Sequence, residues 1–140
     1  MRITRSEDIA MLVMAELSRS HARELLSLAS IASHHGLSPL FLKKIARDLR
    51  RAGLIESKEG IAGGYRVVRR PGDVTVWEVL RAVGKPELEA PRTYLTATSC
   101  PLKSPCLPQE IRRTLSLALT ERFQKLTISE LIGEPAYDPQ

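Results

Sequence analysis

The sequence predicts a mainly α-helical fold with a small β-hairpin: a winged helix-turn-helix followed by a long C-terminal dimerisation helix. Three observations predict it. Two helical segments are joined by a tight turn that contains glycine, a hairpin pattern directly follows the second of them, and another apolar stripe at helical spacing lies near the C-terminus. Of the 140 residues, 43% are apolar and only 4% aromatic, so we expect one domain with a mainly aliphatic core and one added oligomerisation element.

The first two helices are expected over residues 6–18 and from about Leu28 to Gly36. Ser6 is the candidate cap of the first helix and Ser27 that of the second, because a serine hydroxyl satisfies a free backbone N–H at a helix start. The first segment has apolar residues at helical spacing, namely Ile9, Leu12, Val13 and Leu17. The second helix is short, about two turns.

The third helix is expected to begin at Ser38-Pro39, because serine caps a helix and proline suits the first helical position. Its apolar stripe consists of Phe41, Leu42, Ile45, Ala46 and Leu49. Its other side is basic and carries Lys43, Lys44, Arg47, Arg50 and Arg51. A short helix, a tight turn and an amphipathic basic helix form the pattern in which the second helix enters the DNA major groove.

A β-hairpin is expected from residues 54–57 and 65–68, with a glycine-rich tip between them. A hairpin placed directly after a recognition helix makes a winged helix. The next helix is expected over residues 74–83, with Asp73 as a possible cap and Trp77 in the core. From Pro108 onward an apolar stripe predicts a helix for dimerisation; the alternative is that this helix packs back on its own domain.

The charge distribution indicates an acidic partner. The net charge is +5, the isoelectric point is about 9.6, and residues 43–70 hold nine basic and three acidic side chains. Nucleic acid is the first candidate, and a solvated basic face is the alternative. The sequence has no apolar run long enough for a membrane span and no visible export signal, and its two cysteines suit a reducing cytosol, so we expect a cytoplasmic protein. No catalytic motif appears, and we expect no enzyme.

Over residues 1–133 the chain resembles the Rrf2 family of bacterial winged-helix regulators. The similar segments include the opening Met1-Arg2-Ile3-Thr4, the third-helix end Leu49-Arg50-Arg51-Ala52-Gly53-Leu54-Ile55 and, most specifically, the wing Gly60-Ile61-Ala62-Gly63-Gly64-Tyr65. The family includes an iron–sulfur cluster regulator, a nitric-oxide-sensitive repressor and a cysteine-metabolism repressor. The resemblance implies a homodimer that binds a double-stranded DNA operator and does not bind membranes.

The resemblance also draws attention to the cysteines. Cluster-sensing members place three cysteines, with five residues between neighbours, before the long helix. Here Cys100 and Cys106 have this spacing. Tyr94 stands where the third would fall if these are the last two, and Arg112 stands there if they are the first two. Asp8 lies where nitric-oxide-sensitive members supply a carboxylate from the partner subunit. Asp8, Cys100 and Cys106 are therefore candidate ligands of an iron–sulfur cluster; a thiol–disulfide switch, a bound metal ion and a loop without cofactor remain alternatives.

The expected organisation is a winged helix-turn-helix DNA-binding domain over residues 1–86, a cysteine-containing sensor loop over 87–107, a dimerisation helix over 108–133 and a disordered tail over 134–140. The expected DNA contacts are Ser38, Leu40, Phe41, Lys43, Lys44 and Arg47 of the third helix and Lys58, Gly63, Gly64, Tyr65 and Arg66 of the wing. Phe41 and Tyr65 have the alternative of packing in the domain. Many family members place arginine before the first wing glycine, whereas this chain has Glu59.

We therefore expect a dimeric, sequence-specific DNA-binding transcription regulator. It is expected to act as a repressor that responds to redox state, nitric oxide or iron–sulfur status through the Cys100/Cys106 loop. The alternatives are a constitutive DNA-binding regulator with no cofactor, a Cys100–Cys106 thiol–disulfide switch without a cluster, and a winged helix used only for protein contacts.

Overall fold

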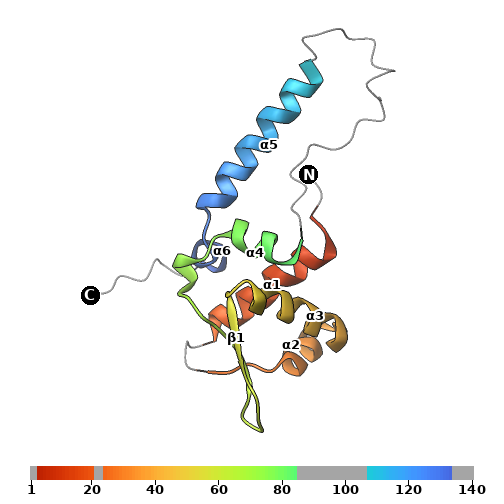
Figure 1. Cartoon of the computed structure of the whole chain (residues 1–140), viewed down its shortest axis with the longest axis vertical. Coiled ribbons are helices and arrows are strands. Elements are labelled where there is room, and N and C mark those ends of the chain that lie inside the picture. Colours follow the sequence, from red (N-terminus) through yellow and green to blue (C-terminus); the bar gives the residue numbers. More distant parts are fainter. Residues whose placement is uncertain (1–2, 21–23, 85–106, 134–140) are drawn as a thin grey trace, which may run out of the picture.

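The computed structural model describes residues 3–20, 24–84 and 107–133, and it has the mainly helical fold with one hairpin that the sequence predicts (Figure 1). Its elements, in chain order, are α1 (Arg5–Arg19), α2 (Leu28–His35), α3 (Pro39–Arg51), β1 (Ile55–Lys58), β2 (Gly64–Val67), the 3-10 turn η1 (Pro71–Asp73), α4 (Val76–Val83), α5 (Leu107–Lys125) and α6 (Ile128–Ile132). Among these residues, no helix is both long and apolar enough to span a membrane.

The caps of α1 and α4 are threonines, which corrects two predictions. Thr4, not Ser6, caps α1, because its hydroxyl accepts from the N–H of Glu7 at 3.3 Å and Glu7 Oε2 accepts from the N–H of Thr4 at 2.7 Å. Thr75, not Asp73, caps α4 through the same reciprocal pair with Glu78. A threonine followed three residues later by glutamate satisfies two free N–H groups, which a lone Ser or Asp does not.

Helix α1 lies at the centre of the core. Its apolar stripe is buried to 1% exposure or less at Val13, Met14 and Leu17. The buried side chains of the same core come from several elements and include Leu42, Ile45 and Leu49 of α3, Val79 of α4 and Ile128 of α6. Since α6 supplies a core residue, the C-terminal segment is part of the same packed unit.

The wing is a two-stranded antiparallel hairpin, and a third backbone segment lies along the first residues of β2. Lys58 pairs with Gly64, so both strands are shifted by one residue from their predicted ranges. Leu26 and Tyr65 exchange two N–H to carbonyl hydrogen bonds of 2.9 Å each. A Cβ atom on Gly64 would lie 2.8 Å from the Leu26 carbonyl oxygen, so this crossing of two backbones requires glycine.

A backbone bridge joins α4 to the turn between α5 and α6. The N–H of Val76 donates to the Leu126 carbonyl at 2.8 Å, and the N–H of Ile128 donates to the Val74 carbonyl at 2.9 Å. Residues 108–133 thus hold two helices, because Thr127 leaves the helical conformation and caps α6. The residues 134–140 and most of the predicted loop 87–107 lie outside the described part of the chain.

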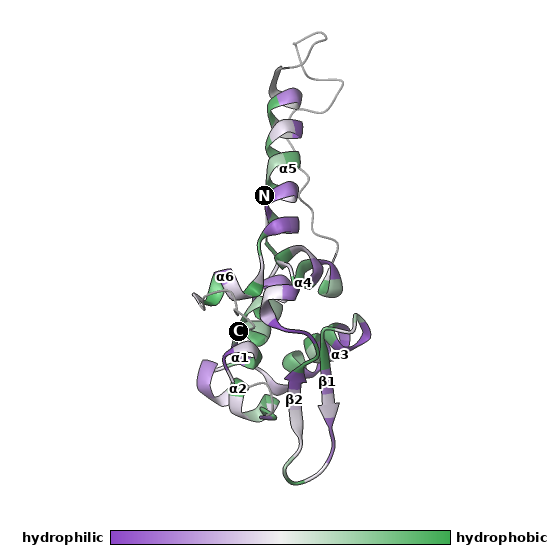
Figure 2. Ribbon diagram, turned by 90° about the vertical axis from the view of Figure 1, so that its left-hand side faces the viewer, coloured by the Kyte–Doolittle hydropathy of each residue, from purple (hydrophilic) through white to green (hydrophobic). Residues whose placement is uncertain are grey.

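Helix α5 projects from the body at the end opposite the hairpin tip, as both views show (Figures 1 and 2). The hydropathy colouring shows apolar and polar residues alternating along it (Figure 2). Ile111 is 51% exposed and Leu115 is 58% exposed, although both belong to its apolar stripe. The wing and the apolar stripe of α5 therefore occupy opposite ends of the molecule.

Candidate nucleic-acid interface

Helix α3 separates an apolar face from a basic one. Leu42, Ile45, Ala46 and Leu49 are buried at 0–1% exposure. The other face exposes Lys43, Lys44, Arg47, Arg50 and Arg51. Within the described ranges, Lys43 and Lys44 have no acidic partner, and Arg47 approaches Asp48 only to 4.0 Å. The packing of the apolar face against α1 thus fixes which way this group of cations points.

The N-terminal turn of α3 presents a hydroxyl and an apolar side chain to solvent. Ser38 is exposed and its side chain makes no cap hydrogen bond, and Leu40 is 79% exposed. Phe41, a predicted DNA contact, is half-buried against the core. The guanidinium of Arg5 lies over its ring at 5.7 Å from the centroid, within the range of a cation–π contact. Phe41 therefore positions Arg5, a cation that helical spacing alone does not place near α3.

The hairpin follows α3 directly and is tied to it. The Arg50 Nη1 donates to Ser57 Oγ at 3.0 Å, which joins the last turn of α3 to β1. Lys58 is exposed at the far end of β1, and the described residues offer it no acidic partner. The wing is thus anchored to the last turn of α3.

Two predicted wing contacts have partners within the domain. The Arg66 guanidinium pairs across the hairpin with Glu56, so its charge is compensated. Tyr65 packs against the hydrophobic core, which is the alternative kept open for it. Gly63 ends the turn and Gly64 begins β2, and at both positions neighbouring backbone leaves no room for a side chain. Lys58 is therefore the uncompensated cation among the wing residues predicted to contact DNA.

A second ion pair stabilises the link between the wing and α4. The Arg69 Nη2 donates to Glu78 Oε1 at 2.5 Å, while the Thr75 N–H donates to Glu78 Oε2 at 2.9 Å. Burial raises the pKa of Glu78, but the Thr75 and Arg69 hydrogen bonds and the Arg69 charge outweigh it, so that this pKa is lowered overall. Arg69 is thus held against the domain.

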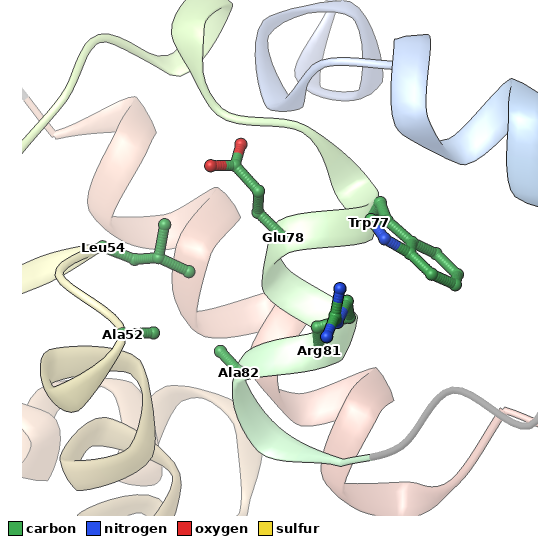
Figure 3. A pocket seen from close by; sticks show the side chains of 6 residues that line it. All are labelled: Ala52, Leu54, Trp77, Glu78, Arg81 and Ala82. Atoms are coloured by element: carbon green, nitrogen blue, oxygen red, sulfur yellow. The ribbon is translucent and has the colours of Figure 1, made fainter.

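Beside this pair, α4 and the turn between α3 and β1 border a shallow pocket of about 290 Å³. Trp77 is half-buried at this pocket, whereas the sequence predicts it in the core. Figure 3 shows its indole on the side of α4 away from Leu54 and Ala52. The physical reason is that the inward face of α4 is already filled by Val76, Val79 and Leu80.

Of the candidate cluster ligands, the structure describes only Asp8. Asp8 is exposed on the first turn of α1, next to the buried Glu7. Cys100 and Cys106 lie outside the described part of the chain. Leu12, one turn after Asp8, has no donor atom, so the candidate set stays at three donors, one short of the four that iron–sulfur clusters commonly use. This donor set does not fit a cluster held by one subunit.

The chain matches known proteins over nearly its whole length. The model of the Rrf2 family, described as an iron-dependent transcriptional regulator, matches residues 3–134. The transcriptional regulator IscR of Klebsiella pneumoniae is 30% identical over 133 residues, which are 95% of this chain and 80% of that protein. Protein rrf2 of Nitratidesulfovibrio vulgaris is 26% identical over 141 residues, which are 100% of this chain and 93% of that protein.

The fold is likewise similar to that of solved structures. The structure of CymR, the global cysteine regulator of B. subtilis, superposes with a TM-score of 0.77 at 26% identity and covers 95% of this chain and 97% of its own. The likeness therefore includes the helix-turn-helix, the wing and the C-terminal helices. The winged-helix fold class predicted from the sequence is confirmed.

Proposed function

This chain belongs to the Rrf2 family of transcriptional regulators, and we propose that it is a dimeric, sequence-specific DNA-binding repressor with a redox-responsive loop. The family consists of regulators and not enzymes, in agreement with the sequence. The observation that carries the proposal is the group of uncompensated cations on α3 beside a projecting wing. Lys43 and Lys44 are exposed, and the described residues hold no acidic partner for either.

The chemistry of this surface suits duplex DNA. Exposed lysine and arginine side chains gain affinity by releasing the counterions of phosphates. The first turn of a recognition helix meets base edges, where Ser38 offers a hydroxyl and Leu40 an apolar contact to a thymine methyl group. We assign sequence reading to this turn and phosphate contacts to Lys43, Lys44 and Arg47.

The experiment that tests DNA binding is selection of duplexes from a random-sequence pool by the wild-type protein, followed by a fluorescence anisotropy titration at several salt concentrations. We expect a near-palindromic consensus, because a two-fold dimer imposes its symmetry on the site, and an affinity that falls steeply with salt. An unenriched pool with a flat salt titration would contradict the proposal. The repressor assignment is tested by transcription in vitro from a promoter that contains the consensus. Addition of the protein should lower the transcript level.

Dimerisation is proposed through α5, whose apolar stripe is exposed in the single chain. Truncation before α5 is a poor test, because it also removes Ile128 from the core. We instead expect Ile111→Lys combined with Leu115→Lys to give a monomer in analytical ultracentrifugation. Leu117→Lys is the matched control, since Leu117 is 61% exposed but lies about 200° around the helix from Leu115. A double variant that remains a dimer contradicts the assignment.

The signal is proposed to act through Cys100 and Cys106. Oxidation by a peroxide would join the two sulfur atoms in a disulfide, while the two thiol protons and two electrons reduce the peroxide to water. We prefer this thiol switch because the cluster donor set is one ligand short. The test is anaerobic purification with a visible spectrum, iron and acid-labile sulfide counts, and DNA titrations of the reduced and peroxide-treated protein.

The outcomes of this test are distinct. A colourless protein whose DNA affinity changes on oxidation, and does so no longer after Cys100→Ser, supports the thiol switch. A brown protein with iron and sulfide contradicts it, and Asp8, Cys100 and Cys106 are then the ligands to substitute. A colourless protein with unchanged affinity makes this a constitutive regulator.

A further inference from the structure

The tip of the wing is a tight turn with apolar residues at its centre. The N–H of Gly63 donates to the carbonyl of Gly60 at 3.0 Å, so Ile61 and Ala62 occupy the two central positions of a β-turn. Turn centres ordinarily carry Gly, Pro, Asn, Asp or Ser. Ile61 is nevertheless completely exposed, with a relative accessibility of 110%. The domain itself gains nothing from burial of this side chain.

The backbone around Ile61 is tightly constrained. Gly60 has φ +120°, a conformation that side-chain-bearing residues rarely adopt. A Cβ on Gly63 would lie 2.2 Å from the Lys58 carbonyl oxygen and 2.9 Å from that of Gly60. The turn is therefore closed against the end of β1, and Ile61 is held away from the body rather than folded back onto it.

Charge does not explain what the turn residues themselves would contact, because Lys58, the uncompensated cation of the wing, lies outside the turn at the end of β1. Lys58 and Glu59 are adjacent and opposite in charge, and Arg66 is paired with Glu56. The turn from Gly60 to Gly63 has no charged or polar side chain. If these residues contact DNA, the interaction must come from van der Waals contact and from burial of apolar surface.

We propose that Ile61 is a specificity-determining contact that enters the minor groove of the operator and selects A·T pairs there. This inference rests on the proposed function as a DNA-binding protein. Apolar side chains are among those that proteins insert into the minor groove. The groove floor of a G·C pair carries the guanine N2 amino group, which takes up space and would lose its water against an isoleucine. An A·T pair has no such group.

The test compares Ile61→Ala with wild type on a duplex enriched from a random pool by the wild-type protein. We expect about fiftyfold weaker binding for each half-site, because three carbon atoms lose their burial on each wing, with an unchanged dependence on salt, because no phosphate contact is lost. Ile61→Leu keeps the apolar volume and should bind like wild type. Val68→Ala is the matched control, since Val68 is 51% exposed beyond the end of β2.

Base substitutions in the same duplex test the groove and the base preference. At the pairs under the wing, G·C in place of A·T should weaken wild-type binding, whereas inosine·cytosine should not, because inosine lacks the N2 amino group. Ile61→Ala should lose this discrimination. Equal binding of wild type and Ile61→Ala overturns the inference while leaving the proposed function intact. Failure of wild type to bind any duplex instead overturns the proposed function, and the tip would then fit a protein partner.

Discussion

Removal of two cations from the recognition helix gives the sharpest test of the proposed DNA surface. Lys43→Ala combined with Arg47→Ala removes two exposed side chains that face away from the core, so we expect the fold and the dimer to persist. The described residues hold no acidic partner for Lys43, and Arg47 is only 4.0 Å from Asp48, so neither substitution abolishes a strong ion pair. The loss should therefore appear in DNA binding rather than in stability.

The magnitude follows from counterion release. Each lost phosphate contact lowers the slope of log affinity against log salt by about 0.9, and a dimer with two copies of α3 loses four such contacts. The slope should thus become shallower by about 3.6, and the affinity near 0.1 M salt should fall by roughly three to four orders of magnitude. Removal of the same charge elsewhere should have little effect, since screening confines the attraction to about 10 Å at this salt.

The assay is an anisotropy titration with the enriched duplex at four or more salt concentrations, with circular dichroism and sedimentation to verify the fold and the dimer. The control is Arg81→Ala combined with Lys125→Ala, which removes the same charge from α4 and α5. A double variant of α3 that keeps the wild-type slope would refute the assignment of phosphate contacts to this helix. An equal loss in the control would mean that net charge, rather than this surface, drives binding.

Three further predictions concern the wing, the core and the response to pH. Gly63→Ala should open the hairpin, because its Cβ would lie 2.2 Å from the Lys58 carbonyl oxygen. Hydrogen exchange at the wing should then rise and the DNA affinity should fall. Gly72→Ala is the control and should leave both unchanged, because nothing lies within 4 Å of a Cβ at Gly72. Ile128→Ala should lower the free energy of unfolding in urea by about 2–5 kcal/mol, and a loss below about 1 kcal/mol would contradict the packing of α6 into the core. The folded-state pKa of Glu78 lies below its ordinary value of 4.5, so its carboxylate stabilises the fold above that pH and this contribution is lost as the pH falls through the folded-state pKa. Glu78→Gln should accordingly flatten the decline of stability between neutral and acidic pH, and an unchanged profile would show that the cap and ion pair contribute nothing.

Some site residues were predictable because their orientation depends only on local spacing. The apolar positions of α3 recur every three or four residues, and burial of that face necessarily turns Lys43, Lys44 and Arg47 outward. The hairpin was predictable to within one residue for a similar reason, since alternating strands and a glycine-rich tip are local signals. The cap of α2 was predictable in the same way, and Ser27 does accept from the N–H of Ser30, whereas the caps of α1 and α4 are reciprocal Thr-to-Glu pairs that the single residues Ser6 and Asp73 do not supply.

Other site residues depend on partners far away in the sequence. Arg66 alternates like an outward wing cation, and only the strand register brings Glu56 opposite it. Arg5 belongs to the first helix, and only the packing of α1 on α3 puts it over Phe41. The sequence shows an isoleucine between wing glycines but not whether its side chain packs on the domain. Only the structure shows that Ile61 is fully exposed.

The sequence by itself determined the winged-helix pattern, the basic face of α3 and the apolar stripe of α5, because amphipathic periodicity fixes which face of an element is buried. Only the tertiary structure decided that α6 closes the core through Ile128, that Leu26 extends the hairpin and that Trp77 is half-buried outside the core. Each of these depends on which distant segments fill the same volume. Competition for a limited core is settled by the packing of the whole chain and not by any local spacing.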